Sequence, residues 1–228
     1  MATDPWTSPT ALGAGASTAT TFMAKVYRWM ALGLGLTGVV AFAVADSPSL
    51  LHTIFSTPLM WVLFIGQLGL VIAFTRMVRT ASFATVAGMF LAYCALSGVT
   101  FASILMVYTR ESIASTFFIT GGTFLAMSAY GTLTKKDLTS WSQFLMMGLI
   151  GVVIASLVNI FIHSDALGFI VSCAGVLVFT GLTAYDTQKI RAYADAGDDR
   201  LALNGALALY LDFVNLFLML LRFFGRRR

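Results

Sequence analysis

The stretch WSQFLMMGLIGVVIASLVNIFI, residues 141–162, contains no charged side chain. An α-helix needs about 20 consecutive apolar residues to cross the hydrocarbon of a bilayer, so this stretch predicts a transmembrane helix. Long runs with few or no charges recur in the chain at residues 30–45, 59–75, 81–108, 112–133, 166–185 and 205–221. The sequence therefore predicts about seven membrane spans.

The composition agrees with this interpretation. The chain is 58% hydrophobic and 11% charged, with a mean hydropathy of +0.87, whereas soluble domains have about 25% charged residues. The apolar runs are too long for the tilted strands of an outer-membrane barrel and lack their alternation, so backbone hydrogen bonds must close within each segment. The predicted fold class is all-α: a polytopic membrane protein.

The chain divides into a short tail and one membrane domain. Residues 1–26 are polar and rich in Ala, Thr, Ser and Gly, with Pro5 and Pro9, and they predict a flexible N-terminal tail. Residues 27–228 form the predicted seven-helix transmembrane domain. Pro48 and Pro58 fall in the first connection, where they interrupt helices.

Basic residues in short loops predict the orientation, because cytoplasmic loops carry an excess of Lys and Arg. With a cytoplasmic N-terminus the outer loops hold only Arg110, and the inner segments hold Lys25, Arg28, Arg76, Arg79, Lys135, Lys136, Lys189, Arg191 and Arg200. The terminal residues 226–228, all arginines, oppose this bias if the last helix crosses fully. We expect it to cross, since residues 205–224 make about 30 Å of helix. The net charge of +4 thus reflects topology, and no nucleic-acid partner is expected.

Two aspartates, Asp186 and Asp212, interrupt the apolar stretches near the end of the chain, and a carboxylate in hydrocarbon is costly. Asp186 alone fits an interfacial residue beside Lys189 equally well. Asp212 must face protein or water, and it lies about 10 Å into a helix that starts near Gly205. Both carboxylates are expected in the cytoplasmic half of the membrane.

These residues belong to two longer motifs, TGLTAYDTQKI at residues 180–190 and GALALYLDFVNLFLMLLRFFG at residues 205–225. Both motifs resemble the transmembrane Bax inhibitor motif family in its bacterial form. The resemblance implies two three-helix layers around a central seventh helix, and a pH-sensitive calcium leak. It also implies that Asp186 and Asp212 form a proton-sensing pair near the cytoplasmic mouth. An arginine near the inner end of the second helix would pair with the first aspartate, and Arg76 and Arg79 are both candidates.

Elementary electrostatics gives a compatible mechanism. Two carboxylates close together in low dielectric cannot both ionise cheaply, so they share one proton and form a pH switch. Calcium prefers six to eight oxygen ligands, and the two carboxylates with Tyr185 and Asn215 supply fewer. Asp186 and Asp212 are therefore predicted to hold calcium transiently, as a transported ion, and no resident cofactor is expected.

Two other classes of protein remain open. Paired transmembrane aspartates also occur in intramembrane aspartyl proteases, but those have Gly-x-Gly-Asp where this chain has Leu209-Tyr-Leu-Asp212, so we expect no enzymatic activity. The other class is an interaction protein of the membrane, which restrains a membrane-bound protease or other stress or cell-death machinery through the tail before Lys25. Short loops and tails favour a bacterial inner membrane, with the lipid bilayer as the immediate partner.

Overall fold

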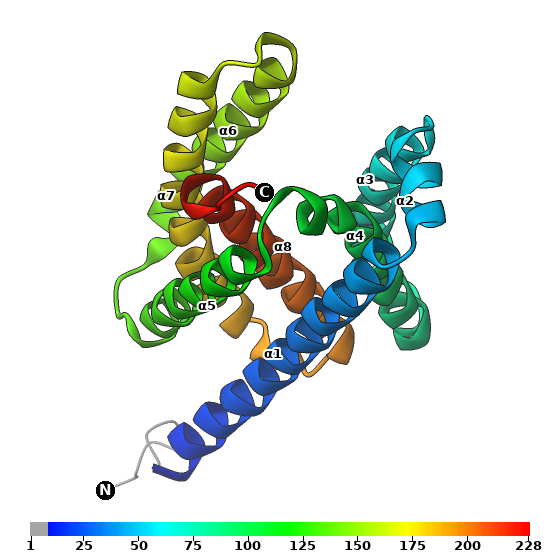
Figure 1. The fold of residues 1–228 in the computed structure, drawn as a ribbon. Helices are drawn as coiled ribbons and strands as arrows, with labels where there is room; N and C mark the ends of the chain where they lie inside the picture. Colours follow the sequence, from blue (N-terminus) through cyan, green and yellow to red (C-terminus); the bar gives the residue numbers. More distant parts are fainter. Residues whose placement is uncertain (1–8) are drawn as a thin grey trace, which may run out of the picture.

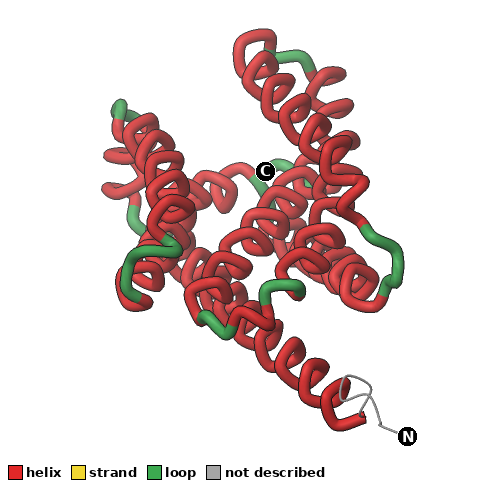
Figure 2. The backbone as a smooth tube through the Cα atoms, turned by 180° about the vertical axis from the view of Figure 1, so that it is seen from behind, coloured by secondary structure: helices red, strands yellow, loops and turns green. Residues whose placement is uncertain are grey.

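The computed structural model describes the backbone of residues 9–228 and the side chains of residues 18–228. This part of the chain is almost wholly helical, with short connections (Figure 2). The α-helices in it are α1 (Pro9–Ala45), α2 (Pro48–Phe55), α3 (Leu59–Met77), α4 (Phe83–Val107), α5 (Arg110–Leu133), α6 (Ser142–Ile162), α7 (Asp165–Arg191) and α8 (Asp199–Phe224). Within the described residues, all of these except α2 are long and apolar enough to span a membrane, giving seven spans. The predicted all-α membrane fold is confirmed.

Side-chain caps define where several spans begin. Ser82, Thr109 and Ser164 precede α4, α5 and α7, and each side chain accepts a hydrogen bond from the backbone N–H three residues later. Such caps satisfy backbone donors that have no partner within the helix. They restrict the connections to a few residues and so hold successive spans antiparallel.

Helix α8 forms the centre of the molecule (Figure 1). Helices α1, α3 and α4 pack together on one side of it, and α5, α6 and α7 form a second group on the other side. Leu203, Leu209, Tyr210 and Leu216 of α8 are completely buried. This is the arrangement of two three-helix layers that the family resemblance implied.

The membrane domain begins earlier than the sequence predicted. Helix α1 starts at Pro9, and Phe22, Met23 and Val26 are buried in the core, so the boundary expected at residue 26 lies inside a packed helix. The reason is that these apolar side chains lie three and four positions apart, on one helix face. The start of α1 projects beyond the other helices (Figure 1). Of the predicted tail, residues 1–8 lie outside the described part of the chain.

The C-terminus is attached to the α4–α5 connection. The Thr109 N–H donates to the Arg226 carbonyl at 3.1 Å, and the Arg228 N–H donates to the Val107 carbonyl at 2.9 Å. Helix α8 begins beside the end of α7, and the residues that follow it bond to the α4–α5 connection. It therefore runs through the whole bundle and does not turn back. We call these two ends of the bundle the α7–α8 end and the C-terminal end.

Candidate functional site

Asp186 and Asp212 come from α7 and α8, which pack against each other along the centre of the bundle. Asp186 lies five residues before the end of α7. Asp212 lies 13 residues into α8, about 20 Å from its first residue, rather than the 10 Å expected from a start near Gly205. The helix begins earlier because Asp198 caps it and residues 199–204 continue the helical turn into the polar connection.

The two carboxyl groups lie close enough to act on each other across the contact between α7 and α8. Asp212 is only 5% exposed and Asp186 is partly buried. The Asp212 Oδ2 atom is buried and has no hydrogen-bond partner among the described residues. A buried charged acceptor without a donor costs more than about 1–3 kcal/mol, and a proton on either carboxyl group removes this cost by providing a donor. A proton shared by the two carboxyl groups would therefore relieve the cost of burying them.

A chain of hydroxyl groups joins the two helix layers next to this aspartate pair. Tyr27 of α1 is hydrogen-bonded to Ser128 of α5, and the Ser128 hydroxyl lies 3.0 Å from the Thr187 hydroxyl of α7. Thr187 directly follows Asp186, and both Ser128 and Thr187 are buried. A hydrogen bond is worth more where water does not compete, so these contacts hold α1, α5 and α7 together beside the carboxyl groups. The sequence analysis missed them, because single hydroxyl residues are common in membrane helices.

The backbones of α5 and α7 come into direct contact at the same level. A Cβ atom added at Gly131 would lie 2.2 Å from the carbonyl oxygen of Ala184, two residues before Asp186. Because backbone atoms cannot give way as a flexible side chain can, only glycine fits at position 131. Small residues let membrane helices approach closely, and here they close the bundle beside the aspartate pair.

The comparison with protein families decides what kind of protein carries this pair. Residues 19–228 match the family described as inhibitor of apoptosis-promoting Bax1. The chain belongs to this Bax inhibitor-like family. The match begins within α1 and includes every span, so it confirms the resemblance seen in the two aspartate motifs.

Bacterial members of the Bax inhibitor-like family match nearly the whole chain. The inner membrane protein YbhL of Escherichia coli (strain K12) is 49% identical over 216 residues, which cover 91% of this chain and 92% of YbhL. A protein of Borreliella burgdorferi is 46% identical over 91% of this chain and 92% of its own length. A membrane protein of Streptococcus pyogenes is 35% identical over 90% and 92%, respectively. The family is one of membrane proteins and is not a known enzyme family.

Two other predicted site residues, Tyr185 and Asn215, have contacts of their own. The Asn215 side-chain amide donates to the Leu211 carbonyl of its own helix at 2.8 Å. The Lys189 ammonium lies 5.6 Å from the centre of the Tyr185 ring, which gives Tyr185 a cation–π partner. The Asn215 amide and the Tyr185 ring thus have partners other than the two aspartates.

Neither candidate arginine forms an ion pair with Asp186. Arg76 and Arg79 are exposed, and the ion pairs found among the described residues are Lys25–Asp199 and Arg200–Asp198. The cation whose field acts on Asp186 is Lys189, one helical turn further along α7. Lys189 is thus a positive charge near Asp186 on the same helix.

The aspartate pair lacks the ligands of a permanent metal site. Among the described residues, no three His, Cys, Asp or Glu side chains gather closely enough to hold a metal ion. Two carboxyl groups supply at most four oxygens, fewer than the six to eight that calcium prefers. A cation at this pair would keep part of its water shell, and such a site releases its ion readily.

Proposed function

We propose that this Bax inhibitor-like protein is a pH-sensitive calcium leak channel of the bacterial inner membrane, gated by Asp186 and Asp212. One observation carries the proposal: two carboxyl groups lie close enough to act on each other where two central membrane helices pack, and the buried Asp212 Oδ2 atom has no hydrogen-bond partner among the described residues. Carboxyl groups inside a membrane mark ion or proton pathways, because their desolvation needs a functional reason.

The shared proton sets the direction of the pH response. While the proton is held, it bridges the two carboxyl groups and α7 stays packed on α8. Loss of the proton leaves two like charges in low dielectric, which favours separation of the helices and entry of water. The closed state binds more protons than the open state, so rising pH shifts the population toward the open state. Calcium flux is expected to rise with pH.

The groups that surround the pair support gating at the α7–α8 end. The other helices packed there contribute neutral hydroxyls, Tyr27 from α1 and Ser128 from α5, while Lys189 on α7 is the charged neighbour. Opening would break the Tyr27–Ser128–Thr187 chain and separate the Gly131 and Ala184 backbones. Once separated, the carboxylates would face a water-filled path and attract a divalent cation.

The test is calcium flux into liposomes that contain only the purified protein, measured from acid to alkaline pH. Asp186→Asn and Asp212→Asn are each expected to abolish the pH dependence, because either change removes the shared proton. Asp46→Asn is the matched control, since Asp46 is an exposed carboxylate in the connection between α1 and α2. A wild-type pH profile in both site variants would rule out the pair as the sensor.

The same measurement separates the channel from the second candidate, an interaction protein that restrains a membrane protease. That candidate is favoured by the start of α1, whose backbone projects beyond the other helices (Figure 1). A pure interaction protein gives no flux in liposomes at any pH. The channel conducts without a partner.

A further inference from the structure

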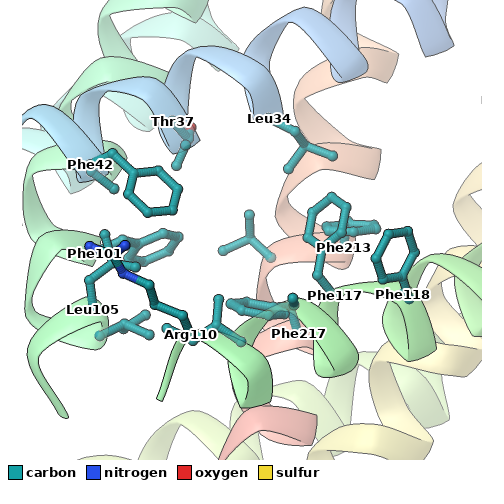
Figure 3. A pocket seen from close by; sticks show the side chains of 16 residues that line it. Leu34, Thr37, Phe42, Phe101, Leu105, Arg110, Phe117, Phe118, Phe213 and Phe217 are labelled. Carbon is teal, nitrogen blue, oxygen red and sulfur yellow. The ribbon is translucent and has the colours of Figure 1, made fainter. Parts of the chain in front are cut away.

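A second feature of the molecule lies toward the C-terminal end of the bundle. A cavity of about 380 Å³ opens between α1, α4, α5 and α8 (Figure 3). Apolar side chains from all four helices line it, among them Leu34, Phe42, Phe101, Phe117, Phe213 and Phe217. Its volume falls within the range of about 300–1,000 Å³ typical of ligand sites.

The cavity opens sideways, toward the membrane. Phe42 of α1 and Phe118 of α5 line it and are 50% and 76% exposed, so its rim lies on the surface that lipid covers. From Arg110 to Phe118 the cavity follows α5 for about 12 Å, which compares with about 15 Å for one leaflet of the hydrocarbon. It therefore has the position and depth of one acyl chain of the adjoining leaflet.

One charged side chain borders this apolar space. Arg110, the first residue of α5, is the single charged residue in the cavity lining, and its side chain runs along the rim toward α4 (Figure 3). The hydrogen bonds between residues 107–109 and 226–228 bring the terminal arginines to the same connection. Glu111, the adjacent acid, does not line the cavity. The rim is thus basic where lipid headgroups lie.

We propose that this cavity binds an anionic phospholipid, with one acyl chain between the two helix layers and the phosphate on Arg110. A guanidinium binds phosphate oxygens through two parallel hydrogen bonds, which favours Arg over other cations at such a site. The acyl chain would lie against α8, the helix that carries Asp212. Lipid binding in this cavity does not depend on ion conduction.

Two glycines of α1 allow a matched test of the apolar part. A Cβ atom added at Gly38, which lines the cavity, meets no atom within 4 Å, and the same holds at Gly35, which does not line it. Gly38→Leu therefore starts a large apolar side chain in the open space of the cavity, and Gly35→Leu places the same side chain on the same helix elsewhere. Arg110→Gln removes the charge at the rim, and Arg28→Gln is its control at the α7–α8 end.

The experiment uses phosphatidylglycerol with a photoreactive diazirine on one acyl chain, and phosphatidylcholine with the same chain, in liposomes with the full protein. Mass spectrometry of digested protein should find the phosphatidylglycerol adducts on peptides that line the cavity. A hydrogen bond to a charged group is worth about 1.5–3 kcal/mol, so Arg110→Gln should lower this labelling about tenfold or more. Gly38→Leu should abolish it, and both control variants should label like the wild type.

Three results would overturn the proposal. Equal labelling by the two phospholipids would show that no anionic headgroup is selected. Unchanged labelling in both Arg110→Gln and Gly38→Leu would show that the acyl chain does not enter this cavity. Displacement of the label by oleate as effective as displacement by phosphatidylglycerol would assign the site to a fatty acid instead.

Discussion

The two ends of the bundle are built in opposite ways. At the α7–α8 end, polar contacts tie the connections to the helices: Gln188 bonds to the Lys136 carbonyl and the Leu138 N–H, both at 2.9 Å, and Arg200 donates to the Arg79 and Ala81 carbonyls at 3.1 Å. The C-terminal end is hollow. Besides the cavity under Arg110, it holds a polar cavity of about 850 Å³ bordered by Asn159, Asp165 and Arg222.

For the proposed channel, this difference indicates where a pathway would have to open. Water can enter a large polar cavity without rearrangement, whereas the α7–α8 end holds close backbone contacts and buried hydrogen bonds that would have to break first. The aspartate pair lies beside these contacts. In the proposed channel, a small change in charge at the pair therefore acts on the sealed end, where it has the largest effect on conduction.

The largest effect on stability is expected at the Gly131–Ala184 contact. Gly131→Ala should lower the free energy of unfolding by about 1–3 kcal/mol, because the new methyl group meets a backbone carbonyl. Gly122→Ala on the same helix is the control, since nothing lies within 4 Å of its added Cβ. Thermal unfolding in detergent checks both. If the two variants melt alike, the α5–α7 approach is looser than the structure shows.

The hydroxyl chain gives the next largest effect. Tyr27→Phe removes the Tyr27 hydroxyl from the chain while keeping the ring, which should favour the open state by about 0.5–1.5 kcal/mol and raise the leak at acid pH about two- to tenfold. Ser115→Ala is the control at the hollow end, where the Ser115 hydroxyl donates to the Glu111 and Ser112 carbonyls of its own helix. Flux in liposomes measures both. A Tyr27→Phe leak equal to that of the wild type would mean that this chain does not hold the gate closed.

These predictions depend on contacts that the sequence did not reveal. The apolar runs located the spans well, and the ends at Ala45, Leu133 and Ile162 agree with the structure. The start of α8 was missed because hydropathy detects only the part of a helix in hydrocarbon, and α8 begins with charged residues. Asp186 and Asp212 stood out because carboxylates are rare in apolar stretches. Gly131 and Ser128 did not, since small and hydroxyl residues are frequent in membrane helices and only the packing gives them a partner.

A smaller effect is expected at Lys189. Its charge favours the ionised form of Asp186, so Lys189→Gln should keep the proton on the pair to higher pH and move the flux midpoint upward. Exposed charge pairs are worth about 0.2–1 kcal/mol and one pH unit is about 1.36 kcal/mol, so the shift should be about 0.2–0.7 pH units. Arg76→Gln and Arg79→Gln should leave the midpoint in place, since neither forms an ion pair with Asp186. A larger shift in either arginine variant would mean that an arginine at the end of the second span supplies the positive charge near Asp186.

The smallest effect concerns the connection that leads into α8. Hydrogen bonds from the Arg200 side chain and backbone N–H hold the pKa of Asp198 below its usual value. A carboxyl group with a lowered pKa in the folded state stabilises the protein above its unfolded pKa, near 3.8, and this contribution is lost as pH falls through the folded value. Asp198→Asn keeps a side-chain oxygen that can cap α8 and removes the charge. Because the pair is largely solvated, we expect the variant to lower Tm at pH 7 by about 2 °C or less. Melting curves at pH 7 and pH 3 check this: the difference between the two proteins at pH 7 should be smaller at pH 3. A difference of the same size at both pH values would mean that Asp198 acts through packing, and the α7–α8 end would then be held together without this charge.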